Sequence, residues 1–247
     1  MHDQVEITTR KEIGTRLTSL PEVQRSVAAC RQCPRLVKWR EAVAKEKVRR
    51  FQGEDYWGKP IPSFGDSSAR LLIVGLAPAA HGGNRTGRMF TGDESGNWLF
   101  RTLHRAGFAS QPESVHRYDG LRLTDCYITA TLRCAPPKNK PTREEILNCQ
   151  PFLDNEITLM RDVRVVVGLG KVGFDAALEA FRRVGRIDYA KRPAFAHGAT
   201  YHLGPCTFIA SYHPSQQNTS TGRLTRLMLD SVFAGARQMM GGREEGR

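Results

Sequence analysis

Four of the six cysteines are spaced in a way that suits a metal centre. Cys30 and Cys33 form a C-x2-C pair, and fourteen residues separate Cys134 from Cys149. Four thiolates brought together by a fold can hold zinc or an iron–sulfur cluster. The second spacing is wider than the short knuckle of a zinc ribbon. Spacing alone leaves zinc, iron–sulfur and four unrelated cysteines open.

The other two cysteines, Cys126 and Cys206, lie in or beside apolar runs and are expected to be small core residues. The N-terminal residues lack the apolar stretch of a signal peptide, and no run of eighteen apolar residues occurs. We therefore expect a cytoplasmic protein, in which thiols stay reduced and disulfides are rare.

A long loop, residues 76–95, carries a second group of chemically useful residues. It follows the apolar run 71–75, and loops of this length inside a compact domain are usually functional. His81, Asn84 and Asp93 are polar side chains that can position a water molecule. Phe90 offers an aromatic face on which a planar ligand can stack.

His213 opens a third segment of interest. It directly follows the apolar run 207–212, in a His-Pro-Ser sequence. A histidine at the end of a buried strand can donate a hydrogen bond to an oxygen that gains negative charge during a reaction.

Alternating strand and helix patterns must position these residues. Short apolar runs at 71–75, 126–134, 163–170 and 207–212 predict buried strands. Helical patterns occupy most of 20–50, 96–108, 142–161, 171–185 and 224–240. Thr142 and Glu145 form a predicted capping box. The Gly-, Pro- and Ser-rich residues 51–68 predict a connecting loop.

This order predicts an α/β fold: a three-layer α/β/α arrangement around a central four-stranded, mostly parallel sheet. We expect a single domain over residues 1–247, with a core at about 28–240 and a disordered C-terminal tail. In such sheets the active site lies beyond the carboxyl ends of the strands. The loops after the first, second and fourth predicted strands are therefore the candidate site.

The net charge of +12 favours a polyanionic partner. Arginine outnumbers lysine, and its guanidinium suits bidentate phosphate contacts. A basic solubility surface would have the same composition, so charge alone leaves nucleic-acid binding open.

Residues 168–173 read GLGKVG, which matches the G-x-G-x-x-G pattern of dinucleotide-binding turns. Asp188 even falls where a ribose-binding acid belongs. However, residues 183–193 are too charged for the buried strand that should follow. A tight turn that needs glycine for close packing is the favoured interpretation.

Three segments together resemble one family. Residues 75–93 look like the first active-site motif of the uracil-DNA glycosylase superfamily in its family 5 form, and residues 211–223 look like its histidine–proline–serine motif. The cysteine pattern with the RCAPPKNKPT segment is similar to the iron–sulfur glycosylases of families 4 and 5. The resemblance spans about residues 28–235 and implies a 4Fe–4S cluster on the four cysteines.

The resemblance implies a monofunctional glycosylase that flips uracil out of DNA and hydrolyses its N-glycosidic bond, which initiates base excision repair. Phe90 would stack on the flipped base, and His213 would stabilise the departing base. Asn84 is the favoured residue for holding the water. Asp93 is a carboxylate that could instead brace the loop. Backbone amides of Gly82 and Gly83 could contact the base.

Two positions depart from the wider superfamily. Leu76 and Ala77 stand where other families place a polar side chain, and Ala130 stands where related families read the base with asparagine. A site without a strict donor–acceptor pair discriminates poorly. The resemblance therefore implies a broader range that includes hypoxanthine, ethenocytosine and hydroxymethyluracil.

The polar residues of two loops are expected to bind DNA. The resemblance places Gln216, Gln217 and Asn218 in the minor groove at the gap left by the flipped base. Phosphate contacts are expected from Lys138, Lys140, Ser215 and Arg223. The protein is expected to act as a monomer.

Two alternatives remain open. The fold could serve as a damaged-DNA-binding module without catalysis, because Leu76 and Ala77 carry no polar group. The second alternative is an enzyme that depends on a dinucleotide and binds it with the GLGKVG turn.

Overall fold

The computed structural model describes residues 17–241. Its centre is a six-stranded sheet in the order β1-β3-β2-β4-β6-β5. The four inner strands are parallel and fully buried, which confirms the four predicted strands. They are β2 (Leu71–Gly75), β3 (Cys126–Ala130), β4 (Val165–Leu169) and β6 (Cys206–Ser211).

The expected count of four strands was wrong, because each edge of the sheet carries one antiparallel strand more. β1 (Phe64–Gly65) pairs with β3, and β5 (Thr200–Leu203) pairs with β6. β1 has two residues inside a segment that reads as loop. β5 alternates exposed and half-buried residues. Neither has the continuous apolar run on which the strand predictions rested.

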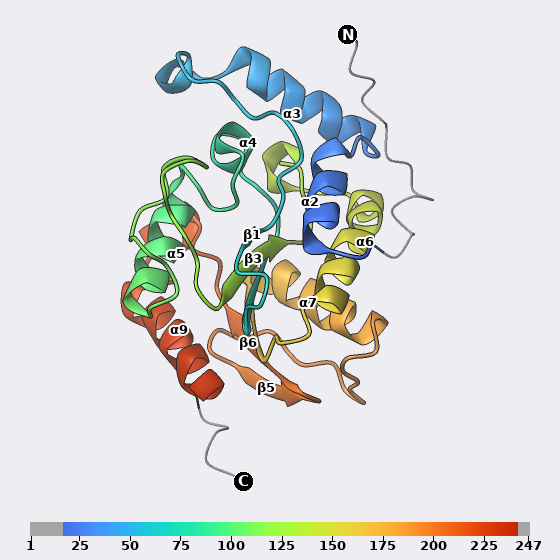
Figure 1. The fold of residues 1–247 in the computed structure, drawn as a ribbon. Coiled ribbons are helices and arrows are strands. Elements are labelled where there is room, and N and C mark those ends of the chain that lie inside the picture. Colours follow the sequence, from blue (N-terminus) through green and yellow to red (C-terminus); the bar gives the residue numbers. More distant parts are fainter. Residues whose placement is uncertain (1–16, 242–247) are drawn as a thin grey trace.

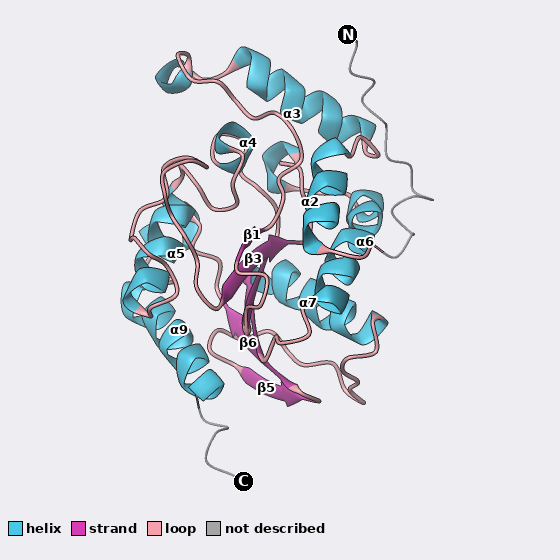
Figure 2. Cartoon of the chain, viewed as in Figure 1, coloured by secondary structure: helices cyan, strands magenta, loops and turns pink. Residues whose placement is uncertain are grey.

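Helices cover both faces of the sheet, as Figures 1 and 2 show, so the predicted three layers are confirmed. One face packs against α5 (Glu94–Arg105) and α9 (Arg226–Gly241). The opposite face packs against α6 (Arg143–Leu159) and α7 (Gly170–Arg183), with α2 (Leu20–Ala29) beside α6.

Alternation along the strands builds the two cores. In β2, Ile73 joins the core under α5 and α9, while Leu72 and Val74 join the core under α6 and α7. Both faces are apolar because both are covered, which is why the parallel strands read as unbroken apolar runs.

The remaining helices lie mostly beyond the carboxyl ends of the parallel strands, at the top of Figure 1. They are α3 (Pro34–Glu46), η1 (Arg49–Phe51), α4 (Gly83–Thr86), η2 (Pro137–Asn139) and α8 (Gln216–Ser220). The predicted helical stretch 20–50 thus breaks into α2 and α3 at the C-x2-C pair.

Two local predictions are confirmed. Thr142 and Glu145 form the capping box of α6, in which each side chain accepts the other residue's backbone amide. The glycines of GLGKVG have a packing role. A Cβ at Gly168 would lie 2.3 Å from the Cα of Phe174, and one at Gly173 would lie 2.4 Å from the Val74 carbonyl oxygen. Only glycine allows α7 to approach the sheet so closely.

Under the carboxyl end of β3 lies a fully buried ion pair. Arg133 and Glu156 of α6 are each 1% exposed, and their side chains meet at 2.5 Å. Thr129 and Ser63 donate hydroxyl hydrogen bonds to the same carboxylate, at 2.7 and 2.6 Å. The pair therefore ties β3, α6 and the segment before β1 together.

None of the helices within residues 17–241 is long and apolar enough to cross a membrane. The expected disorder of the C-terminal tail concerns residues 242–247, which lie outside the described residues.

Removal of one partner of the buried pair should be costly. Glu156→Ala leaves the Arg133 guanidinium buried without its counter-charge, so we expect a loss of about 3–5 kcal/mol in the free energy of unfolding. Urea denaturation measures this loss. Asp154→Ala on the same helix is the matched control. Its pair with Arg183 is partly exposed, so it should cost about 1 kcal/mol or less. Equal losses in the two variants would contradict this assignment.

Candidate active site

Phe90 and His213 meet above the carboxyl ends of the parallel strands. Their ring centroids are 5.7 Å apart and their planes are inclined by 30°. The Phe90 ring lies over Gly75 at the end of β2, where a Cβ would be 3.0 Å from the ring. Gly170, at the start of α7, lies beside His213, since a Cβ at Gly170 would be 3.4 Å from the Cβ of His213. The structure thus brings together two side chains that the sequence places 123 positions apart.

The backbone at Phe90 is in an unusual conformation for a bulky residue, with φ of 51°. A left-handed aromatic residue persists only where its surroundings hold it. Gly96 in the first turn of α5 is one such constraint, since a Cβ there would lie 2.0 Å from the Phe90 carbonyl oxygen. The ring is therefore positioned by close backbone packing.

His213 is neutral in its folded environment. Burial lowers the pKa of its imidazole to about 4. Its carbonyl oxygen accepts a hydrogen bond from the Asn218 side chain at 2.9 Å. This bond holds the loop of residues 213–223, here called the His-Pro-Ser loop, against the strand end.

Arg85 joins the two halves of the loop at residues 76–95, here called the first motif loop. Its guanidinium donates to the carbonyl oxygens of His81 and Gly92, both at 2.8 Å, and pairs with Glu54. The same group stacks 3.7 Å from the ring centroid of Phe51. These bonds satisfy backbone groups that an irregular buried loop would otherwise leave unpaired.

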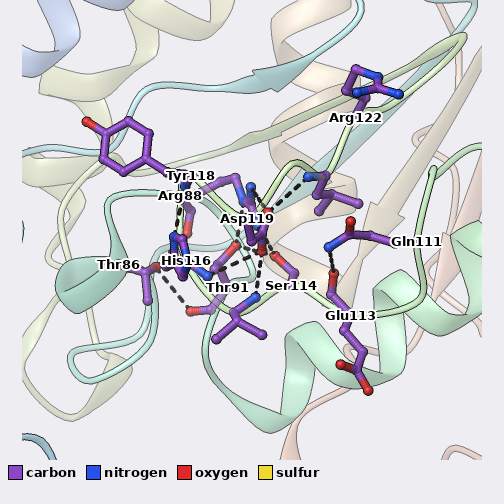
Figure 3. Close-up of polar contacts among 12 residues, drawn as sticks. Thr86, Arg88, Thr91, Gln111, Glu113, Ser114, His116, Tyr118, Asp119 and Arg122 are labelled. Carbon is purple, nitrogen blue, oxygen red and sulfur yellow. Dashed lines mark hydrogen bonds and ion pairs between the residues drawn. The ribbon is translucent and has the colours of Figure 1, made fainter.

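Arg88, within this loop, ties its second half to Ser114 and Asp119, as Figure 3 shows. It pairs with Asp119 at 2.6 Å and donates to the hydroxyl oxygens of Thr91 and Ser114, at 3.0 and 2.7 Å. Thr91 directly follows Phe90, so the Arg88 network braces the stacking residue.

Asp93 braces the first motif loop, which is the second of the two roles that the sequence analysis considers for it. Its side chain caps α5 by accepting the Gly96 amide at 2.9 Å. A Cβ at Gly82 would lie 2.0 Å from the other carboxylate oxygen, so the carboxylate rests on that backbone. Burial raises the pKa of the Asp93 carboxyl above its usual range.

Asn84 lies on α4, on the side of the loop that faces α3. Its side-chain amide donates to the Arg40 carbonyl oxygen at 3.2 Å. Its oxygen Oδ1 is buried and has no hydrogen-bond partner among the described residues. The structure records no contact within residues 17–241 between the Asn84 side chain and either Phe90 or His213.

The predicted base-contacting residues are divided between two places. Ala130 ends β3 opposite Gly75 in the sheet register, so it neighbours the strand end under the Phe90 ring. Ala77 instead packs against the cysteine-containing core. Gly83 is buried close to Pro78: a Cβ at Gly83 would lie 3.0 Å from the Cβ of Pro78.

The predicted DNA-binding residues differ in their structural roles. Ser215 caps α8 by accepting the Asn218 amide at 3.4 Å, and Asn218 turns inward to His213. The exposed residues are free to reach a partner: Lys138, Lys140, Gln216, Gln217 and Arg223. Of these, Arg223 stacks 4.6 Å from the ring centroid of Tyr212, the residue before His213.

The four predicted metal-binding cysteines share one hydrophobic core. Cys134 and Cys149 are buried in it, and Cys30 and Cys33 pack against it. All four are free thiols. Among residues 17–241 no group of three or more His, Cys, Asp or Glu side chains is arranged to hold a single metal ion. Cys126 and Cys206 are buried elsewhere in the sheet, as predicted.

Arg40 links this cysteine group to the first motif loop. Its buried guanidinium donates to Cys134 Sγ at 3.0 Å and to the Cys30 carbonyl oxygen at 3.3 Å. Its own carbonyl oxygen accepts from Asn84. A change at the cysteines can therefore reach the loop through a single residue.

Comparison with known proteins shows to which family this chain belongs. A sequence model of the uracil DNA glycosylase superfamily matches residues 62–236, which include Phe90, Ala130 and His213. The chain belongs to this superfamily.

Several relatives within the superfamily are similar over nearly all of the chain. A type-5 uracil-DNA glycosylase of Thermus thermophilus is 51% identical over 87% of this chain and 96% of its own length. One of Mycobacterium leprae is 48% identical over 90% and 96%. One of Pyrobaculum aerophilum is 48% identical over 83% and 86%. The resemblance seen in the sequence motifs is thereby confirmed.

Sequence reasoning missed the arginines that hold this glycosylase-like site. Arg40, Arg85 and Arg88 are buried, whereas the sequence predicted roles for basic residues only in binding DNA or other polyanions at the surface. Arginines between glycines in a long loop were the available signal for Arg85 and Arg88. Nothing in the sequence connects Arg88 to Asp119.

The neutral state of His213 gives a testable titration. Because its folded pKa lies below the ordinary histidine value of 6.5, the unfolded chain binds the proton more tightly between pH 6.5 and about 4. The free energy of unfolding should therefore fall as pH drops through this window. NMR should show one imidazole with a midpoint near 4, assigned by its loss in His213→Gln. A His213 midpoint near 6.5 would contradict this lowered pKa.

Proposed function

We propose that this protein is a monofunctional DNA glycosylase that flips uracil out of DNA and hydrolyses its N-glycosidic bond, thereby initiating base excision repair. The observation that carries the proposal is the Phe90–His213 pair at the carboxyl edge of the sheet. About half of the residues are identical to proteins named type-5 uracil-DNA glycosylases.

The base is bound by stacking. A flipped pyrimidine is planar, and the Phe90 ring offers a preformed face at the strand ends. Since the backbone around Phe90 is held by Gly96 and the Arg88 network, the face needs little reorganisation when the base arrives.

His213 stabilises the departing base. Cleavage develops positive charge on the sugar and negative charge on the base. A neutral imidazole can donate its N–H to a carbonyl oxygen of uracil, and that bond strengthens as the oxygen becomes anionic. The low pKa of His213 means that the donor is an imidazole and not an imidazolium at neutral pH.

Asn84 holds the attacking water in this proposal. Its buried oxygen Oδ1 has no partner among the described residues, so it can accept a hydrogen bond from that water. The hydrogen bond that its side-chain amide donates to the Arg40 carbonyl oxygen keeps the side chain oriented. Asp93, which caps α5, acts by bracing Gly82 and the first motif loop.

The substrate range extends beyond uracil. Ala77 and Ala130 supply no side-chain donor or acceptor to the base, so strict reading of the Watson–Crick edge is lost. We propose that hypoxanthine, ethenocytosine and hydroxymethyluracil are also released. The exposed Gln216 and Gln217 fill the gap in the duplex, and Lys138, Lys140 and Arg223 bind phosphates.

A 4Fe–4S cluster is the metal group that fits the four cysteines. Their shared core brings together four free thiols, which is the ligand set that a 4Fe–4S cluster takes. Bound there, it would supply iron–thiolate bonds that tie the start of α3 to α6 and to the loop after β3. Hydrolysis transfers no electrons, so the role of the cluster is structural.

The enzyme works as a monomer in the cytoplasm.

Base release tests the function. Wild-type protein incubated with a uracil-containing duplex should create sites that alkali cleaves, and His213→Ala should slow release by about 10²–10³-fold while binding to abasic DNA is kept. His202→Ala is the matched control, since His202 is exposed on edge strand β5. Wild-type binding without release from any damaged duplex would instead support a catalytically silent module. A thermal shift with a dinucleotide would support the GLGKVG alternative.

The cluster has its own readout. Anaerobically purified protein should be brown and contain iron with acid-labile sulfide. Cys33→Ser should lose both, whereas Cys126→Ala should keep them because Cys126 lies in the core under α5 and α9. Stoichiometric zinc without sulfide would contradict the assignment.

A further inference from the structure

The segment between α5 and β3, residues 110–122, forms an arm that reaches back to the first motif loop. Its two ends are joined at the base, where Ser110 and Arg122 exchange hydrogen bonds at 2.9 Å. Further along, the Gly92 amide donates to the Ser114 carbonyl oxygen at 3.0 Å. The arm therefore touches the loop two residues from Phe90.

Asp119 organises the tip of the arm. Its carboxylate accepts the backbone amides of Val115 and Leu121, at 2.8 and 3.0 Å, as well as the Arg88 pair (Figure 3). Burial alone would raise its pKa, but the Arg88 hydrogen bond and the backbone amides lower the pKa of Asp119 to about 2. The carboxylate is therefore charged at neutral pH and holds the tip in one conformation.

This ordered tip carries a half-buried cation beside an exposed aromatic ring. Tyr118 is 79% exposed. The Arg117 guanidinium lies 4.2 Å from the ring centroid of Trp57 and 5.1 Å from that of Tyr118. Lys59 lies 5.6 Å from the same Trp57 ring. Two cations thus share one indole at the outer side of the first motif loop.

Arg117 is not neutralised by the protein. Within residues 17–241 it makes no ion pair, and its Nη1 is buried without a hydrogen-bond acceptor. A guanidinium stacked on an indole keeps its donors in a fixed plane, which suits a phosphate.

Resting on the proposed function, we propose that the tip of this arm is a further DNA-contact site. Arg117 binds a backbone phosphate of the damaged duplex, and Tyr118 packs its exposed ring against the adjoining nucleotide. Lys59 adds to the local positive potential. The arm is joined to the first motif loop at Thr91 and Gly92 through Arg88 and Ser114, so it would hold a stretch of the DNA backbone while Phe90 receives the base.

The binding test uses a duplex with an uncleavable abasic-site analogue, fluorescence anisotropy and a series of salt concentrations. Arg117→Ala should weaken binding and lower the slope of log Kd against log salt by about one, because one phosphate contact is lost. Arg117→Lys should restore most of the slope. Arg122→Ala is the matched control: it removes the same charge from the base of the same arm and should leave the slope unchanged.

The aromatic part is tested separately. Tyr118→Ala should weaken binding about fivefold or more, whereas Tyr118→Phe keeps the ring and should bind as the wild type does. Thermal melts of the variants show whether the arm stays folded. The proposal is overturned if Arg117→Ala keeps the wild-type slope, or if Arg122→Ala lowers it equally.

Uracil release by the wild type is measured in parallel, which separates the two claims. Release by the wild type together with unchanged binding of Arg117→Ala overturns the arm and leaves the proposed function standing. Absence of release from every damaged duplex contradicts the proposed function, and the binding comparison still decides whether the arm contacts DNA.

Discussion

Buried guanidinium groups are the constraint on which this structure depends. Arg40, Arg85, Arg88 and Arg133 are each at most 7% exposed, and all lie at the carboxyl edge of the sheet. An irregular loop there leaves many backbone carbonyl oxygens without regular partners. Arginine has five donors in one plane and can satisfy several of them at once. Each of these groups meets a carboxylate, which offsets the cost of burying the charge. Arg85, Arg88 and Arg133 pair closely with Glu54, Asp119 and Glu156, and Arg40 lies 4.0 Å from Glu41.

This scaffolding explains how a site with few polar side chains can work. The Phe90 ring and the His213 imidazole are held by glycine contacts, loop hydrogen bonds and burial, so the groups that meet the base are positioned in advance. Burial also removes charge from His213. The site therefore offers a stacking face and a neutral donor, which fits the proposed release of uracil as a leaving group that becomes anionic.

Much of the fold was predictable because parallel strands buried on both faces leave apolar runs that are easy to read, as at Leu71–Gly75. Phe90 and His213 were found because each follows such a run on an unusual loop. The edge strands were missed because β5 alternates like a surface segment. The Arg88–Asp119 pair was missed because it joins residues 31 apart through tertiary structure alone. Burial of Asn84 against Arg40 likewise depends on how α3 packs on α4.

The most direct test of the account is a crystal structure with a duplex that contains 2′-fluoro-deoxyuridine, since the fluorine disfavours the oxocarbenium-like transition state and leaves the bond intact. The account predicts that the uracil is flipped out of the duplex and stacked on Phe90, with a His213 ring nitrogen within hydrogen-bond distance of a uracil carbonyl oxygen. A uracil that stays in the duplex, or that occupies a pocket away from Phe90 and His213, would contradict it.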